Sequence, residues 1–311
     1  MAIPTLPFMR FRNHAAVISI VLMLASVATL AVKGLNYGLD FTGGVQIELL
    51  YSESPDLDEI RDSLSAGGYP NHEVVYFGTD TDVLIRLQDA GAVGEAQATQ
   101  TAEAVLEILS ANAGVEVELK RREFVGSQVG EELREQGGLG MLVALGMIML
   151  YIALRFQFKF AVGAVISLAH DVLLTLAFFS ITGLTFDLTV LAAVLAVIGY
   201  SLNDTIVVAD RIRENFRILR GTEPHEVIDI AVTQTLIRTT ITSLTTLLVL
   251  CSLFFFGGQV VEGFSIALIF GVVVGTYSSI YVASSALMFL HITKEDLMPA
   301  VRDKDELDAL P

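Results

Sequence analysis

Long apolar segments separated by short polar ones dominate the hydropathy pattern of the chain. Six of them approach the roughly 20 residues that a helix needs to cross a bilayer. They cover residues 15–32, 137–154, 160–181, 188–209, 239–256 and 264–290. The pattern therefore predicts a polytopic α-helical membrane protein with six transmembrane helices. Arg10 and Arg12 before the first segment would also suit a secretory signal, but the long apolar run favours a retained helix.

The residues between the first two apolar segments follow a different pattern. Alternation of residues such as Val45, Ile47 and Leu49 indicates strands with one buried face. Strands are expected near 45–51, 73–77, 82–87 and 115–123, and helices near 56–65 and 95–111. The order β-α-β-β-α-β is that of a ferredoxin-like α+β domain. We therefore expect residues 33–136 to form a folded domain, here called the outer domain, inserted between the first two membrane helices.

The composition agrees with residence in a membrane. Hydrophobic residues make up 53% of the 311 residues, and the mean hydropathy is +0.63. The formal net charge is −16, and residues 34–136 contain 20 acidic against only 6 basic residues. An acidic outer domain excludes a nucleic-acid partner, which would need a basic surface. The one cysteine, Cys251, excludes a disulfide within the chain.

Basic residues in the short flanking segments predict the orientation of the helices. They lie before the first helix, between the second and third, after the fourth and after the sixth: Arg10, Arg12, Arg155, Lys159, Arg211, Arg213, Arg217, Arg220, Lys294, Arg302 and Lys304. Residues 1–14, 210–237 and 291–311 are therefore expected in the cytoplasm, and the outer domain in the periplasm. The basic stretch after the fourth helix is expected to contact anionic membrane lipids, and Thr222 to cap the helix that follows it.

Ionisable residues within the apolar segments are candidates for function, because a charged side chain at the centre of a membrane helix costs roughly 2.5–3.5 kcal/mol. Asp204 lies near the cytoplasmic end of the fourth segment, and Arg238 lies at a similar depth at the start of the fifth. The two residues either form a static ion pair or act as a proton relay in which the arginine controls protonation of the carboxyl.

Other polar residues are candidates for the lining of a path beside this pair. On the fourth and fifth segments these are Tyr200, Ser201, Asn203, Gln234 and Thr242. His170 and Asp171 lie near the middle of the third segment. They are either relay groups or buried hydrogen-bonding groups that hold neighbouring helices together.

Small residues form two further patterns. GLDFTGG directly follows the first helix, and Asp40, Phe41, Thr42, Gly43 and Gly44 form its core. It predicts a rigid turn in which Asp40 bonds nearby backbone N–H groups, with direct contact to a partner as the alternative. In the last segment, small residues recur every four positions: Gly263, Ala267, Gly271, Gly275 and Ser279. They predict close packing on another helix, in this chain or in a second subunit.

The outer domain has no nucleophile–base pairing and no metal-ligand spacing, and the chain has no glycine-rich phosphate loop. We therefore expect no enzymatic activity, no cofactor and no metal ion.

Three motifs together resemble those of a known family. DFTGG (40–44) follows the first helix, FDLTVLAAVLAVIGYSLNDTIVVADRIREN (186–215) covers the fourth, and RTTITSLTT (238–246) opens the fifth. In these motifs, and over nearly its whole length, the chain resembles the SecF family of bacterial protein-export membrane subunits. That family belongs to the resistance-nodulation-division superfamily.

The resemblance implies a function, partners and a location. Members pair with SecD, a homologous six-helix subunit, and join the SecYEG channel, with YajC and YidC as associates. In the bacterial inner membrane they use the proton motive force to draw unfolded preproteins outward at a late stage. Asp204 and Arg238 match the family's proton-conducting positions. The main alternative is a small-molecule efflux half-transporter of the same superfamily, which the single outer domain disfavours.

Overall fold

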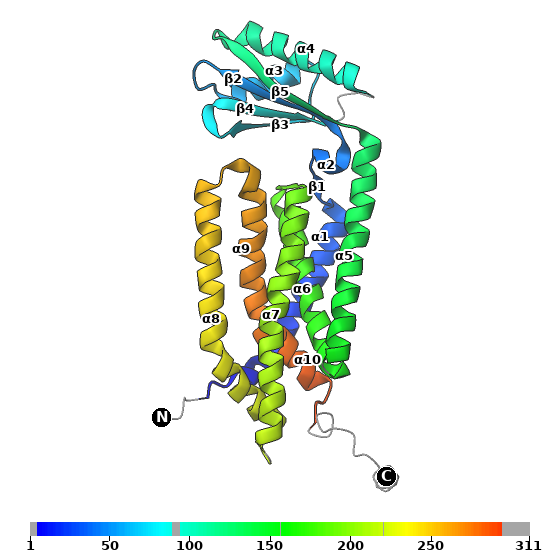
Figure 1. Cartoon of the computed structure of the whole chain (residues 1–311), viewed down its shortest axis with the longest axis vertical. Helices are drawn as coiled ribbons and strands as arrows, with labels where there is room; N and C mark the ends of the chain where they lie inside the picture. The colour runs from blue at the N-terminus through cyan, green and yellow to red at the C-terminus, as the bar shows by residue number, and fades with distance from the viewer. Residues whose placement is uncertain (1–4, 89–93, 156, 220, 294–311) are drawn as a thin grey trace, which may run out of the picture.

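The computed structural model describes residues 5–88, 94–155, 157–219 and 221–293 (Figure 1). Within these ranges six helical spans are long and apolar enough to cross a membrane. They are α1 (Arg12–Lys33, after the 3₁₀ turn η1, Phe8–Phe11), α5 (Ser127–Arg155), α6 (Phe158–Thr182), α7 (Leu188–Ile218), α8 (Pro224–Phe256), and a last span that starts as α9 (Glu262–Tyr277). The last span continues through a π-helical turn, η3 (Ser278–Ala283), into α10 (Ser284–Phe289). The prediction of a six-helix membrane protein is confirmed.

Several helices extend beyond their apolar segments. α5 already begins at Ser127, so it rises to the outer domain as one piece (Figure 1). Within the described residues, α7 and α8 make 210–218 and 224–237 of the segment 210–237 helical. The expectation that Thr222 caps α8 is wrong. Glu223 takes the cap position, because Pro224 with its fixed φ suits the first position of the helix.

The outer domain folds as predicted, as a four-stranded antiparallel sheet with two helices. Its elements are β2 (Gly44–Tyr51), α3 (Leu57–Ala66), β3 (His72–Phe77), β4 (Thr79–Leu87), α4 (Glu95–Ala113) and β5 (Val117–Val125). The strand order β3-β4-β2-β5 is that of the ferredoxin-like fold. Val45, Ile47 and Leu49 are fully buried toward α3 and α4, while the opposite face of the sheet looks toward the membrane helices (Figure 1).

The membrane helices divide into central and peripheral ones. Of the most apolar stretch of each span, 61% is buried in α6 and 50% in both α7 and the last span. The corresponding share is only 17% in α1, 6% in α5 and 17% in α8. The central helices can therefore bury polar groups within the chain, whereas α1, α5 and α8 present most of their surface to lipid or to a partner.

The stripe of small residues on the last span packs against α7. A Cβ atom built on Gly271 would lie 2.2 Å from Val197 Cγ2, and one on Gly275 would lie 3.1 Å from Ser201 Cβ. Ala267 is fully buried in the same contact. Of the two alternatives considered for this stripe, the structure shows packing within the chain, on the central helix α7.

We expect Gly271→Ala to destabilise the protein by about 1–3 kcal/mol, because the added methyl overpacks the contact with Val197. The double variant Gly271→Ala, Val197→Ala should recover much of that loss by making room for the methyl. Gly146→Ala on α5 is a matched control, since its Cβ would meet nothing within 4 Å. Thermal denaturation in detergent, followed by size-exclusion chromatography, measures all three; an unchanged midpoint in Gly271→Ala would contradict the assigned packing.

Candidate functional site

The DFTGG segment forms a tight corner between the first membrane helix and the outer domain. It folds as the single turn α2 (Leu39–Thr42), followed by Gly43 and Gly44 at φ values of +74° and +143°. A Cβ on Gly43 would lie 2.6 Å from the Ser127 backbone, and one on Gly44 would lie 2.2 Å from the Leu87 carbonyl oxygen. Glycine is therefore required at both positions, by backbone conformation and by space. The corner fixes the start of β2 against β4 and the start of α5.

The same corner reaches the outer end of α7. The short strand β1 (Asn36–Tyr37) pairs in parallel with β6 (Thr185–Phe186), directly before α7. Asp40 Oδ2 accepts a hydrogen bond from the Leu188 backbone N–H at 3.0 Å. The expected bond of Asp40 to its own turn is therefore replaced by one across 148 residues. A carboxylate at this position also interacts favourably with the positive end of the helix dipole.

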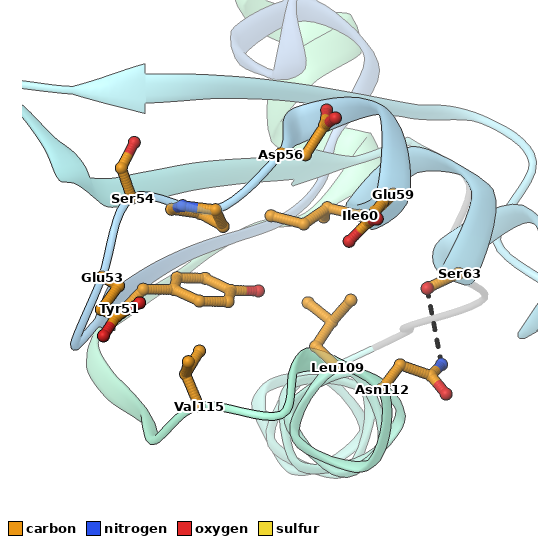
Figure 2. Close-up of a pocket in the computed structure, with 11 residues that line it drawn as sticks. Tyr51, Glu53, Ser54, Asp56, Glu59, Ile60, Ser63, Leu109, Asn112 and Val115 are labelled. Atoms are coloured by element: carbon orange, nitrogen blue, oxygen red, sulfur yellow. Dashed lines mark hydrogen bonds between the residues drawn. The ribbon is translucent and has the colours of Figure 1, made fainter.

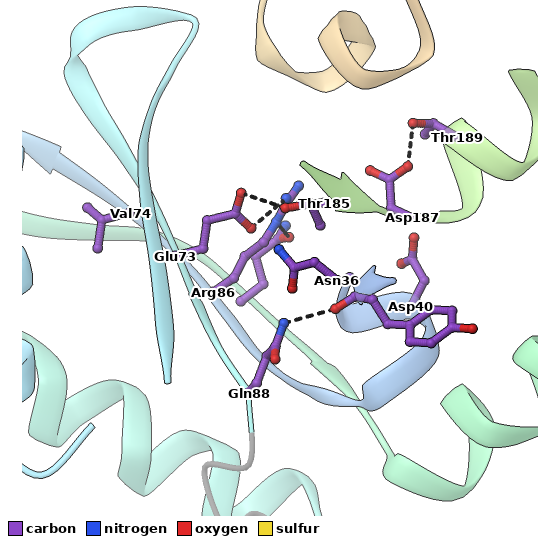
Figure 3. Close-up of polar contacts among 12 residues, drawn as sticks. Asn36, Asp40, Glu73, Val74, Arg86, Gln88, Thr185, Asp187 and Thr189 are labelled. Carbon is purple, nitrogen blue, oxygen red and sulfur yellow. Dashed lines mark hydrogen bonds and ion pairs between the residues drawn. The ribbon is translucent and has the colours of Figure 1, made fainter. Parts of the chain in front are cut away.

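Side chains of the sheet complete the attachment (Figure 3). Glu73 Oε1 accepts a hydrogen bond from Thr185 Oγ1 at 3.1 Å, and Glu73 Oε2 pairs with Arg86 Nη1 at 3.2 Å. Gln88 donates to the carbonyl oxygen of Tyr37 at 3.0 Å. Asp187 is the N-cap residue of α7, and its Oδ1 accepts a hydrogen bond from the Val190 backbone N–H at 2.9 Å. We call the set Asp40, Glu73, Gln88, Thr185 and Asp187 the latch. Through it, the outer domain holds the first turn of α7.

A second polar cluster lies inside the membrane helices, around Asp171 on α6. Its Oδ2 accepts hydrogen bonds from Ser201 Oγ of α7 at 2.5 Å and from Ser278 Oγ at 2.7 Å. Its Oδ1 lies 2.9 Å from His170 Nδ1. Asp171, His170, Ser201 and Ser278 are all fully buried. Ser278 opens the π-helical turn η3, a feature that is frequent at functional sites. The cluster joins α6, α7 and the last span at mid-membrane depth.

Asp204 lies one helical turn beyond Ser201 on α7. It is only 3% exposed, and its Oδ2 atom has no hydrogen-bond partner among the described residues. The buried hydroxyls of Thr205 and Thr239 likewise have no partner in the described part of the chain. Such groups are costly in a protein interior, where each unpaired one costs about 1–3 kcal/mol. A polar region without internal partners thus continues from the Asp171 cluster along α7.

Arg238 lies close enough to Asp204 for a Coulombic interaction, but no direct ion pair joins them in this conformation. The arginine side chain is exposed. It lines a cavity of about 360 Å³ together with Gln234 and Thr235, at the end of the bundle away from the outer domain. The static ion pair considered from the sequence is therefore not formed here.

The remaining candidates separate into different environments. Tyr200 donates from its hydroxyl to Ser243 Oγ at 3.2 Å, and Ser243 lies 2.7 Å from Thr276 Oγ1, which links α7, α8 and α9. Thr242 bonds only within α8, to the Arg238 carbonyl oxygen. Asn203 and Gln234 are exposed. Of the proposed lining residues, the structure thus brings only Ser201 into the Asp171 cluster.

Sequence reasoning missed Ser278 and the neighbouring aromatic residue. The Tyr277 ring centroid lies 6.1 Å from that of His170, and its hydroxyl lies 3.2 Å from Ser19 Oγ of α1. Ser278 directly precedes Ser279 of the small-residue stripe, so the sequence pattern indicated helix packing rather than a polar site. The feature that could have identified Ser278 is its hydroxyl group one position away from that stripe.

Comparison with known proteins places this geometry in a family. Residues 105–293 match the family model described as protein export membrane protein SecD/SecF, C-terminal. Residues 28–54, which contain the glycine corner, match the SecD/SecF GG motif. The chain belongs to the SecD/SecF family. The resemblance noted from its motifs is therefore confirmed.

Relatives from several bacteria support this membership over the full chain. The protein translocase subunit SecF of Pseudomonas aeruginosa is 50% identical over 310 residues, covering 99% of both chains. The SecF subunit of Escherichia coli O157:H7 is 42% identical over 97% of this chain and 93% of the relative. Both relatives therefore align with this SecD/SecF family member over nearly its whole length.

A solved structure has the same fold. The crystal structure of SecDF from Thermus thermophilus, a translocon-associated membrane protein, superposes with a TM-score of 0.79 at 35% identity. The match covers 93% of this chain but only 39% of the SecDF chain. This SecD/SecF family member therefore corresponds to one part of a larger membrane protein in that organism.

We expect Asp40→Ala to loosen the first turn of α7, because it removes the acceptor for the Leu188 N–H. Loss of one hydrogen bond to a backbone N–H costs about 1 kcal/mol, which corresponds to roughly fivefold faster amide exchange in that turn. Hydrogen–deuterium exchange of peptides spanning residues 188–191 measures the effect. Asp40→Asn keeps an acceptor and should change exchange less, and Asp62→Ala on the surface of α3 should not change it. Equal exchange in wild type and Asp40→Ala would count against the latch.

We expect Ser278→Ala to lower the free energy of unfolding by about 1–3 kcal/mol, since it removes a hydrogen bond from a fully buried carboxyl group. Ser201→Ala should act similarly, and the double variant should be non-additive because both hydroxyls bond the same oxygen. Ser252→Ala, at an exposed position of α8, is the control. Thermal denaturation in detergent compares the four; a midpoint unaffected in both single variants would show that the cluster does not stabilise the bundle.

Proposed function

We propose that the chain is a proton-coupled auxiliary subunit of a protein translocase, acting late in the movement of preproteins across the cytoplasmic membrane. Membership of the SecD/SecF family and relatives named protein translocase subunit SecF support a role in protein export. The single observation that carries the coupling is the position of Asp204. This buried carboxyl group lies on α7, whose first turn is held by the outer domain.

α7 supplies a mechanical connection between the two sites. It runs without interruption from Leu188 to Ile218. Asp204 lies about 24 Å from the latch end of the helix, at 1.5 Å per residue. A continuous helix moves as a rod, so a shift at Asp204 would be felt at the latch. The corner at Gly43 and Gly44 would then transfer that shift to β2 and the sheet.

Protonation of Asp204 supplies the change of state. An ionised carboxylate in a buried site needs a cation or hydrogen-bond donors, whereas a protonated carboxyl does not. Arg238 is near but unpaired with it, so the ionised form favours an approach of α8 toward α7 and the protonated form releases it. One proton crossing 100 mV makes about 2.3 kcal/mol available. That is enough to shift a two-state equilibrium by roughly fiftyfold.

A homologous SecD subunit would complete the membrane domain as a heterodimer. Asn203 is exposed within the fourth apolar segment, where lipid offers a polar group no partner, and Arg238 is exposed at the start of the fifth. α8 as a whole is poorly buried within this chain. The larger SecDF chain contains additional sequence beyond the matched 39%. A second six-helix half packed on α8 would cover this polar face and close the path around Asp204, and the pair would assist a protein-conducting channel.

The arrangement also supports an orientation with the outer domain in the periplasm and both termini in the cytoplasm. The N-terminal segment and the end of α10 lie at the same end of the bundle, opposite the outer domain (Figure 1). Arg211, Arg213 and Arg217 lie at this end, in agreement with the positive-inside rule. Arg220, Lys294, Arg302 and Lys304 of the predicted basic flanks lie outside the described residues. The membrane would be the bacterial inner membrane.

Small-molecule efflux is not favoured. The relatives are named translocase subunits, and the chain carries one outer domain of a size suited to contact with a polypeptide. The short 3₁₀ turn η2 (Gln259–Val261) takes the place where a second outer domain would be inserted between α8 and α9.

We expect Asp204→Asn to abolish the part of preprotein export that depends on the proton motive force, because the amide cannot gain or lose a proton at neutral pH. Arg238→Met should reduce the same component. Glu214→Gln, which changes an acid on the same helix that pairs with Arg211, is the matched control and should leave it intact. Export into inverted vesicles, with and without an uncoupler, separates the components. Unchanged uncoupler sensitivity in Asp204→Asn would refute proton coupling at this residue.

A further inference from the structure

A second candidate site lies in the outer domain, on the side of the sheet away from the membrane helices. It is a pocket of about 190 Å³ between the end of β2, the start of α3 and the end of α4 (Figure 2). Sites for small molecules usually measure about 300–1,000 Å³. The volume of this pocket therefore suits one amino-acid side chain rather than a drug-sized ligand.

The walls of the pocket are held in place by hydrogen bonds. Tyr76 donates from its hydroxyl to the Pro55 carbonyl oxygen at 2.6 Å, which fixes the loop between β2 and α3. Asn112 donates to Ser63 Oγ at 3.4 Å, which joins α3 to α4 at the opposite side (Figure 2). The pocket is therefore largely formed before any ligand enters, which reduces the entropy lost on binding.

The base of the pocket combines apolar side chains with one unsatisfied polar atom. Ile60 and Leu109 are buried and face each other across it, and the Tyr51 hydroxyl points between them (Figure 2). Tyr51 is 2% exposed, and its oxygen has no hydrogen-bond partner within the described ranges. Burial raises the pKa of Tyr51 to about 12, so the phenol stays neutral at physiological pH and can accept a hydrogen bond from a cation.

The rim of the pocket is acidic. Glu53, Asp56 and Glu59 surround the opening, and no lysine or arginine is among the lining residues. Among the described residues, one oxygen of Asp56 accepts a side-chain hydrogen bond, from the N–H of Asp58 at the start of α3. The carboxylates lie at an exposed opening, where they attract cations without the large desolvation cost of a buried charge. A long cationic side chain would fit this pocket, because its charged end could meet the carboxylates of the rim and the hydroxyl at the base while its methylene groups contact the apolar walls.

We propose that this pocket binds the arginine or lysine side chain of an extended polypeptide segment at the outer face of the membrane. The guanidinium would donate to Tyr51 and to the rim carboxylates, while its methylene groups lie against Ile60 and Leu109. Arginine fits better than lysine because its five donors can meet several acceptors at once. The inference rests on the proposed function, in which an unfolded preprotein passes the outer domain, and it names the feature of that chain which is held.

The test uses the full chain in nanodiscs and a Gly/Ser-rich peptide with one central arginine beside a benzophenone photo-crosslinker. A second peptide carries citrulline, which keeps the shape of arginine but lacks its charge. At sub-saturating concentration the crosslinking yield at residues 51–63 and 109–115 is proportional to affinity. We expect about tenfold more crosslinking with arginine than with citrulline, falling as salt concentration rises. Equal yields from the two peptides would overturn the proposal.

Variants of the pocket distinguish binding from a structural role. Tyr51→Phe and Glu59→Gln should each lower the arginine-dependent yield about threefold to tenfold. Tyr51→Phe should also leave the thermal stability unchanged or raise it, since it removes a buried hydroxyl without a partner. Glu103→Gln, an exposed acid of α4 outside the pocket, is the control. If neither pocket variant lowers the yield more than Glu103→Gln does, the pocket is not the binding site.

The failure of this inference can be told from failure of the proposed function. Asp204→Asn should keep the arginine-dependent crosslinking while losing export driven by the proton motive force. Loss of the arginine preference, with export still sensitive to Asp204→Asn, would reject the pocket alone. Normal export in Asp204→Asn would reject the coupling mechanism, whatever the crosslinking result.

Discussion

The hydrogen bonds that Ser201 and Ser278 donate to Asp171 are the interaction on which the membrane domain depends. They bring α6, α7 and the last span together around one carboxyl group that has no access to solvent. In hydrocarbon no other donors are available, so the helices must approach closely enough for these bonds to form. The small residues of α9 permit that approach, since Gly275 faces Ser201 itself. The hydrogen bonds to the buried carboxyl group and the close packing of small residues therefore both require α7 to lie against α6 and the last span.

This arrangement gives α7 a double role. Its middle is held by the Asp171 cluster, while the Leu188 N–H at its outer end donates to Asp40, which lies 148 residues earlier in the chain. Asp204 lies between this cluster and the end of α7 away from the outer domain, among hydroxyls that have no partner in the described residues. A rigid helix that tilts about its packed centre would turn a change of charge at Asp204, on one side of that centre, into movement of the outer domain attached at its other end. The outer domain, attached through the latch, is the part that such movement reaches.

The two faces of the sheet in the outer domain make different contacts. The face toward the membrane carries Glu73, which binds Thr185 of the membrane domain. The helical face carries the acidic pocket around Tyr51, directed away from the bilayer. In the proposed function, this division would let one face transmit motion while the other contacts a polypeptide. A hydroxyl left unpaired at the base of that pocket is a local loss of stability, of the kind that proteins retain at functional sites.

Features that depend on local patterns could be predicted from the amino-acid sequence. Hydropathy over 18 or more residues identified all six spans, and alternation such as Val45, Ile47, Leu49 identified the strands, because burial of a face repeats with the period of its element. The cost of a charge in hydrocarbon singled out Asp204 in the same way. The folded structure was needed to show that Asp40 bonds Leu188 across the chain, that Ser278 rather than Asn203 reaches the buried carboxyl of Asp171, and that the stripe containing Gly271 packs on α7. Those pairings depend on the rotation and depth of each helix relative to the others, which no single segment encodes.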